Sequence, residues 1–100
     1  MQITIQKNGQ EAIVLLSGEL DTTATTEQSE DLQQVLDLAD KNMVVDCSRL
    51  EYISSAGLRF FMQLKRESEA HGGSVRIENM NEDVAEIFRM SGFQNIFVIN

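Results

Sequence analysis

Residues 51–64 read EYISSAGLRFFMQL, a segment in which two adjacent serines precede an apolar run with helical spacing. Leu58, Phe61 and Met62 recur at the intervals of one helix face, with more apolar residues beside them, which predicts a well-buried helix. Ser54 and Ser55 stand at its start, where a serine hydroxyl commonly caps free backbone amides. The segment therefore predicts a helix whose leading serines are either a cap or a functional site.

A buried strand is expected just before this junction. Residues 42–47 (NMVVDC) are the continuous apolar run typical of buried strands, and they predict a strand that ends near Asp46. In α/β domains, functional sites usually lie at the carboxyl ends of strands. Asp21 follows another expected strand, so we expect it beside the serine loop. Two hydroxyls where one would cap, together with this position, favour a functional role in addition to capping.

The remaining segments predict the rest of the fold. Residues 2–17 alternate around an Asn8-Gly9 turn and indicate an antiparallel hairpin. Residues 18–40 begin with turn chemistry and continue with helical spacing through Ala39. Further elements are expected as a helix end at residues 71–73, a strand at 74–79, a short helix around 84–88 and a strand at 95–100 (NIFVIN).

Strands separated by helices require crossover connections and mainly parallel pairing. We therefore predict an α/β fold for residues 1–100: one small domain with a mixed, mostly parallel sheet, an N-terminal hairpin and about three helices.

Composition limits the classes of function. The 100 residues are 42% apolar and carry a formal charge of −8, which disfavours direct binding to nucleic acid or to an anionic membrane. We expect no signal peptide in MQITIQK and no membrane insertion, because no apolar run is long enough. The single Cys47 has no internal disulfide partner, so we expect a cytoplasmic protein.

Catalysis and metal binding find little support. His71, the one histidine, stands at the far end of the helix that begins near Ser55, roughly 20 Å away at ~1.5 Å per residue. A histidine there complements the helix dipole and cannot serve as the base for these serines. One cysteine and one distant histidine form no metal-ligand cluster, and no phosphate-binding glycine motif is present. We expect no enzyme, no metal and no cofactor.

Four segments, in order, resemble STAS domains, the bacterial anti-sigma-factor antagonists: GELD (18–21), VVDCSRLEYISSAGL (44–58), GGSVRIENM (72–80) and IFRMSGFQNIF (87–97). The family's motif is Asp-Ser-Ser/Thr-Gly-Leu at a helix start. Ser54 stands at the position of the Asp, and Ser55 at the position of the phosphorylated serine. The resemblance thus implies phosphorylation of Ser55, with Ser54 as the alternative. It implies a partner-binding surface comprising Asp21, Ser54, Ser55, Ala56, Gly57 and Leu58.

The resemblance also implies partners. The unmodified protein is expected to bind an anti-sigma factor with serine kinase activity and so free a sigma factor. Phosphorylation by that kinase would end the binding, and a PP2C-type phosphatase would restore it. The alternative is a soluble STAS subunit that regulates a membrane transport complex. A small esterase using Ser55 is a third possibility and lacks a usable base.

Overall fold

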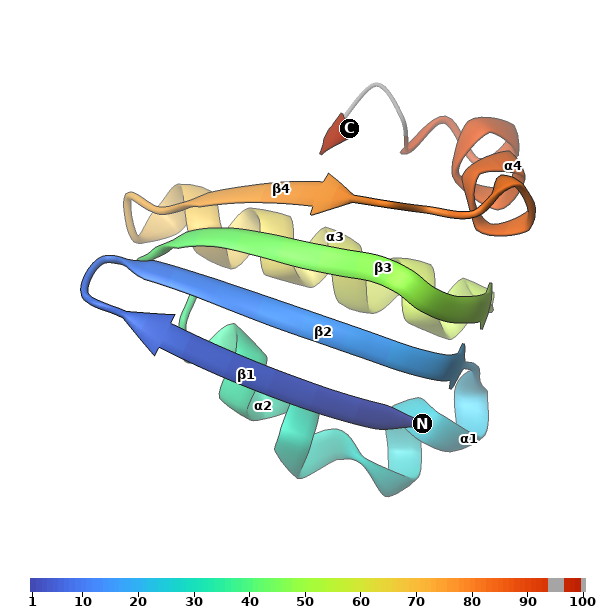
Figure 1. Cartoon of the computed structure of the whole chain (residues 1–100), viewed down its shortest axis with the longest axis horizontal. Helices are drawn as coiled ribbons and strands as arrows, with labels where there is room; N and C mark the ends of the chain where they lie inside the picture. The colour runs from blue at the N-terminus through green and yellow to red at the C-terminus, as the bar shows by residue number, and fades with distance from the viewer. Residues whose placement is uncertain (94–96, 100) are drawn as a thin grey trace.

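The computed structural model describes residues 1–93 and 97–99 and forms one five-stranded sheet flanked by helices (Figure 1). The strands are β1 (Gln2–Asn8), β2 (Glu11–Leu20), β3 (Asn42–Ile53), β4 (Ser74–Glu78) and β5 (Val98–Ile99). The helices are α1 (Thr22–Glu27), α2 (Ser29–Leu36), α3 (Ser55–Ala70) and α4 (Glu82–Met90). Strand order follows the chain, with β1 antiparallel to β2 and the other pairs parallel. This confirms the predicted fold class. Of the final strand expected at 95–100, residues 95, 96 and 100 lie outside the described part.

The helices after the hairpin cover one face of the sheet, and the other face is open. Figure 1 shows α2 and α3 behind the sheet, and none of the helices of the described residues lies in front of it. In β2 and β3, alternate residues are buried, such as Val14 and Val45, while Ile13 on the opposite face keeps 41% of its surface exposed. The prediction of a strand buried on both faces was therefore wrong, because helices pack on one side only.

β3 is also twice as long as expected, because the strand continues through a polar stretch. Its pairing with β2 is shifted twice, between Leu15 and Ser17 and between Gly18 and Glu19, so β3 carries extra, bulged residues. The Asp46 carboxylate accepts a hydrogen bond from the Ser48 amide at 2.9 Å and holds the first irregularity. A bulge interrupts side-chain alternation without ending the strand, which explains the misplaced boundary at Asp46.

The helix expected before β3 is two helices, so the described residues hold four helices where about three were predicted. Chain direction changes at Gln28, which ends α1 and begins α2. The Thr25 and Thr26 hydroxyls both donate to the Thr22 carbonyl, at 2.8 and 3.1 Å. Such side-chain bonds compete with continuous helix geometry. α2 ends at Leu36, so the helical spacing that was expected to reach residue 39 stops one turn early.

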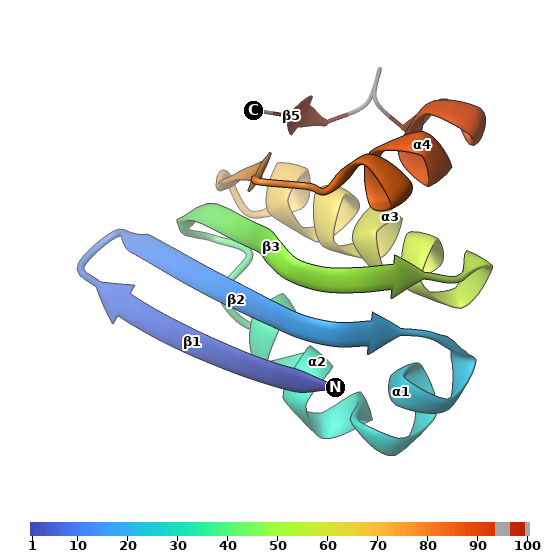
Figure 2. The ribbon, with the colours of Figure 1, turned by 45° about the vertical axis from the view of Figure 1, so that its right-hand side comes forward.

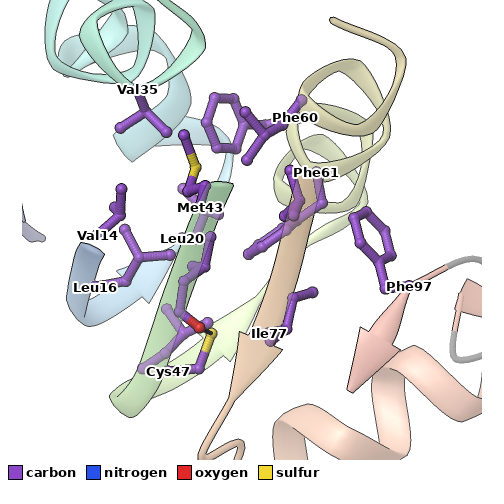
Figure 3. Close-up of a cluster of buried hydrophobic side chains, with 14 of the residues drawn as sticks. Val14, Leu16, Leu20, Val35, Met43, Cys47, Phe60, Phe61, Ile77 and Phe97 are labelled. Atoms are coloured by element: carbon purple, nitrogen blue, oxygen red, sulfur yellow. Dashed lines mark hydrogen bonds between the residues drawn. The ribbon is translucent and has the colours of Figure 1, made fainter. Parts of the chain in front are cut away.

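α3 contributes the centre of the core, as Figure 3 shows for Phe60 and Phe61. Phe61 is fully buried and lies edge-on to Phe88 of α4, with ring centroids 5.5 Å apart. The most buried positions of α3 are Gly57, Phe60, Phe61, Leu64 and Ser68. Leu58 and Met62 are half-buried at the flank, so the buried face is rotated from the predicted stripe.

Candidate functional site

The parallel register of β2 and β3 brings the predicted site residues to one end of the sheet. Leu20 pairs with Ile53 at the last step of this ladder, and Asp21 and Ser54 follow immediately. The first turns of α1 and α3 therefore begin side by side (Figures 1 and 2). The Asp21 carboxylate caps α1 by accepting a hydrogen bond from the Ala24 amide at 2.8 Å. The expectation that Asp21 lies beside the serine loop holds in this geometry.

Ser54 is the N-cap of α3 and ties the two strand ends together. Its hydroxyl accepts from the Gly57 amide and donates to the Leu20 carbonyl, both at 3.3 Å. Its own amide donates to the same carbonyl at 3.0 Å. A carboxylate at this position could accept from the helix amide but could not donate to the carbonyl. Ser54 is half-buried, and its hydroxyl is engaged in these two structural hydrogen bonds.

Gly57 is required by the close approach of α3 to β2. A Cβ built on Gly57 would lie 2.6 Å from the Leu20 carbonyl oxygen and 2.7 Å from Cγ1 of Ile53. Both distances are below any real Cβ contact, so a larger residue would push the helix start away from the sheet. The glycine thereby fixes the position of the serine that precedes it by two residues.

Ser55 is exposed at the first position of α3, where the helix leaves its leading amides without intrahelical partners. Its hydroxyl takes no part in the described side-chain hydrogen bonds. Ala56 and Leu58 beside it are half-buried. The two serines are thus distinct: Ser54 is held in the cap, and Ser55 presents a hydroxyl to the surface next to a positive helix end.

An acidic hollow of about 360 Å³ adjoins Asp21. Its lining includes Glu19 from the end of β2, Glu27 from α1 and Glu51 from β3. Sequence reasoning missed Glu19 and Glu51 because their proximity depends on the bulged register of β2 against β3. Tyr52, which pairs with Glu19, was also missed and is 45% exposed. Ile53 is buried, so strand alternation alone indicates that Tyr52 points away from the core.

A groove of about 530 Å³ runs from the serine loop between α2 and α3. Its apolar lining includes Leu32 and Phe60, and its polar lining includes Arg59 and Arg66. Arg59 lies one helical turn after Ser55 on α3, so the two side chains share one helix face. The groove with its two cations therefore reaches Ala56, the neighbour of Ser55, whereas the acidic hollow lies around Asp21.

His71, the one histidine, is not placed to act as a general base for Ser55. His71 caps the opposite end of α3, where its Nδ1 lies 2.9 Å from the Glu67 carbonyl oxygen. Within residues 1–93 and 97–99, no group of three or more His, Cys, Asp or Glu side chains is placed to hold a metal ion. None of the helices described is long and apolar enough to cross a membrane.

Two groups with shifted pKa values lie on β3, away from the serine loop. Burial, and then the neighbouring Asp46 carboxylate, raise the pKa of the Cys47 thiol to about 12. The Ser48 amide lowers the pKa of Asp46, with smaller contributions from the Ser48 hydroxyl and the Asn79 side chain, while burial opposes the shift. Cys47 is free and fully buried in the core (Figure 3), so neither group prepares a nucleophile.

Comparison with known proteins agrees with this architecture. BtrV of Bordetella bronchiseptica, described as an anti-sigma factor antagonist, is 29% identical over 99 residues, which cover 99% of this chain and 85% of BtrV. The anti-sigma factor antagonist SpoIIAA in its unphosphorylated form superposes with a TM-score of 0.80 at 19% identity, covering 99% of this chain and 88% of SpoIIAA. Phosphorylated SpoIIAA of Bacillus gives 0.71 at 19% identity, with coverage of 99% and 91%.

The same fold occurs in a sulfate transporter family protein of Wolinella succinogenes, with a TM-score of 0.74 at 15% identity, covering 90% of this chain and 76% of that one. These structural likenesses show a shared fold. The family model described as "Mlab, STAS domain" matches residues 3–99. A match over nearly the whole chain, with this fold, establishes that the protein belongs to the STAS domain family.

Proposed function

We propose that this protein is a cytoplasmic anti-sigma-factor antagonist: a non-catalytic binding module that captures an anti-sigma factor with serine kinase activity. Phosphorylation of Ser55 ends the binding, and a PP2C-type phosphatase restores it. The observation that carries the proposal is the difference between the two serines. Ser54 is committed to the cap, whereas Ser55 is exposed at the start of α3. The similarity to BtrV, over 99% of this chain and 85% of BtrV, supports the class of partner.

The helix start can accept a phosphate without unfolding. A phosphoserine adds about −1.5 to −2 charges, and the free amides and positive dipole end of α3 favour an anion there. Arg59, one turn along the same helix, is placed to offset part of the charge. The modified protein should therefore keep its fold, and the switch should act at the surface.

The phosphate acts through size and desolvation. The acidic hollow that contains Glu19, Asp21 and Glu51 favours a basic partner, and such a partner would be attracted to extra negative charge at long range. In a close contact, a phosphate cannot occupy the space of a hydroxyl, and burying it without a pairing cation costs several kcal/mol. That cost weakens binding by about two to three orders of magnitude.

The test compares variants of Ser55 as baits for proteins of the native cytosol. Wild type and Ser55→Ala should retain a serine kinase, and Ser55→Glu should lose it. Ser74→Glu is the matched control, because Ser74 is an exposed serine at the other end of the sheet. Calorimetry with the purified kinase should give a Kd about 100-fold to 1,000-fold higher for Ser55→Glu. Wild-type affinity in a correctly folded Ser55→Glu variant would contradict the switch.

A second function is favoured by one observation. Ser54 occupies the family's Asp position, and it fills the cap with a neutral hydroxyl. A chain of this kind would suit a STAS subunit that regulates a membrane transport complex without being phosphorylated, and the fold is shared with a sulfate transporter family protein. Retention of transporter components in place of a kinase, equally by wild type and Ser55→Ala, would identify this alternative.

A further inference from the structure

β1 forms one edge of the sheet, with β2 on one side and no strand on the other within the part of the chain described (Figure 2). It pairs with β2 without interruption from Gln2↔Ser17 to Asn8↔Glu11. β1 contains no proline and no bulge, and Lys7 is its one charged residue. Natural edge strands usually carry prolines, bulges or several charged side chains, which block pairing with another chain. The edge of β1 is therefore open to strand addition.

The turn of the hairpin determines which backbone groups face this edge. Gly9 and Gln10 form a two-residue turn, with Gly9 at φ 62°, so Asn8 and Glu11 close the hairpin as a hydrogen-bonded pair. Hydrogen-bonded and non-hydrogen-bonded pairs then alternate along an antiparallel ladder. Ile3, Ile5 and Lys7 fall at the non-hydrogen-bonded positions, so their amides and carbonyls point away from β2.

The side chains of β1 alternate between the two faces of the sheet. Ile3 and Ile5 lie on the helix-covered face and are only half-buried, at the rim of the hydrophobic core. Gln2, Thr4 and Gln6 are exposed on the open face and are neutral. A strand added here would complete the hydrogen bonds of Ile3 and Ile5 and also extend the apolar layer that covers them.

We propose that β1 pairs antiparallel with β1 of a second copy about a two-fold axis, forming a continuous sheet through both subunits. The register sets Ile3 opposite Ile5 of the other copy, Thr4 opposite Thr4, and Gln2 opposite Gln6. In the centre of the strand, Ile3 and Ile5 then meet each other across the interface, and the neutral polar side chains of Gln2, Thr4 and Gln6 meet their like, as a self-complementary interface requires. Lys7 falls at the rim, opposite Met1, where its charge stays in water.

The pairing of like side chains in this register favours a second copy of this chain as the partner strand. Shifting the axis from Thr4 to Ile5 would place Lys7 opposite Ile3 on the core side, which would remove the sorting of side chains. The interface uses the edge of β1, whereas Ser55 lies beyond β2 and β3. The dimer would therefore carry two separate copies of the serine surface, and the inference does not depend on the proposed function.

Engineered cysteines test the register directly. Thr4 stands at a non-hydrogen-bonded pair with its equivalent, where Cα atoms are about 4.5 Å apart, within the range of a disulfide. Thr4→Cys should form a covalent dimer under mild oxidation. Gln2→Cys alone and Gln6→Cys alone should not, because each lies about 13 Å from its equivalent. A mixture of those two variants should cross-link. Cys47 will not interfere, because it is fully buried.

Light scattering tests the association itself. Wild type should reach twice the 11.3 kDa mass of one chain as concentration rises. Thr4→Lys opposes two like charges and should raise the dimer dissociation constant at least about tenfold. Gln34→Lys, on an exposed position of α2, makes the same charge change away from the edge and should leave it unaltered. A wild type that stays monomeric to millimolar concentration, or a dimer insensitive to Thr4→Lys, would overturn the proposal.

Discussion

Ser54→Ala tests the division of roles between the two serines through stability. Loss of a serine N-cap costs about 0.5–2 kcal/mol of unfolding free energy. The Ser54 hydroxyl also donates to the Leu20 carbonyl, and loss of one hydrogen bond adds about 0.5–1.5 kcal/mol. Because both bonds are at 3.3 Å, near the long end of the range, we expect a total of about 1–2 kcal/mol.

Ser55→Ala is the matched control, one residue along the chain. Ser55 is exposed, and alanine suits a helix, so its replacement should change the free energy of unfolding by less than about 0.5 kcal/mol. Urea unfolding followed by circular dichroism at pH 7 gives both values. Ser54→Ala should also lower Tm by about 4–8 °C per kcal/mol in a domain of this size.

Either of two results would refute this reasoning. Equal losses in the two variants would mean that Ser55 shares the cap. A loss below about 0.3 kcal/mol for Ser54→Ala would mean that neither hydrogen bond of the Ser54 hydroxyl contributes to stability. Ser54→Asp adds a further check: it keeps the bond to the Gly57 amide and loses the donation to Leu20, so its stability should fall between alanine and wild type.

Three further predictions follow from the same contacts. Gly57→Ala should destabilise the fold by about 1–3 kcal/mol, because the new Cβ meets the Leu20 carbonyl; an unchanged urea midpoint would contradict the close approach. Asp46 has a lowered pKa, so its contribution to stability is complete above its ordinary value of 3.8 and is lost as the pH falls below it. Asp46→Asn should therefore lose less stability than wild type between pH ~5 and ~2, and parallel acid-unfolding curves would count against this. The Cys47 thiol, with its pKa raised to about 12, should resist iodoacetamide at pH 8 until the chain unfolds; rapid labelling of native protein would show that the thiol is accessible.

The sequence predicts most of the architecture because apolar periodicity marks the strands and the buried helices. It also predicts the proximity of Asp21 to the serine loop, since carboxyl ends of neighbouring parallel strands meet at one edge. The length of β3 could not be predicted, because its bulges interrupt the alternation that identifies a strand. The break between α1 and α2 lies at Gln28, whose backbone leaves the α-helical region at φ −111° and ψ 29°, and glutamine is an ordinary helix former that does not mark a helix end in the sequence.

The local sequence pattern also could not assign different roles to Ser54 and Ser55, and it could not predict which residues form the surface around them. The commitment of Ser54 depends on the Leu20 carbonyl, which is distant in sequence and becomes a neighbour only through the pairing of β2 with β3. The acidic hollow depends on the same pairing, because Glu19 and Glu51 come from different strands. The sequence shows the serines and the acidic residues themselves. Which residues they contact depends on the register in which β2 pairs with β3.

Phosphate mapping tests the central claim most directly. Wild type, Ser54→Ala and Ser55→Ala are incubated with ATP and the kinase recovered from native cytosol, and the modified residue is located by tandem mass spectrometry. We expect one phosphate on Ser55 in wild type and in Ser54→Ala, and none in Ser55→Ala. Phosphate on Ser54, or on neither serine with a kinase that binds wild type tightly, would contradict the assignment of Ser55 as the switch.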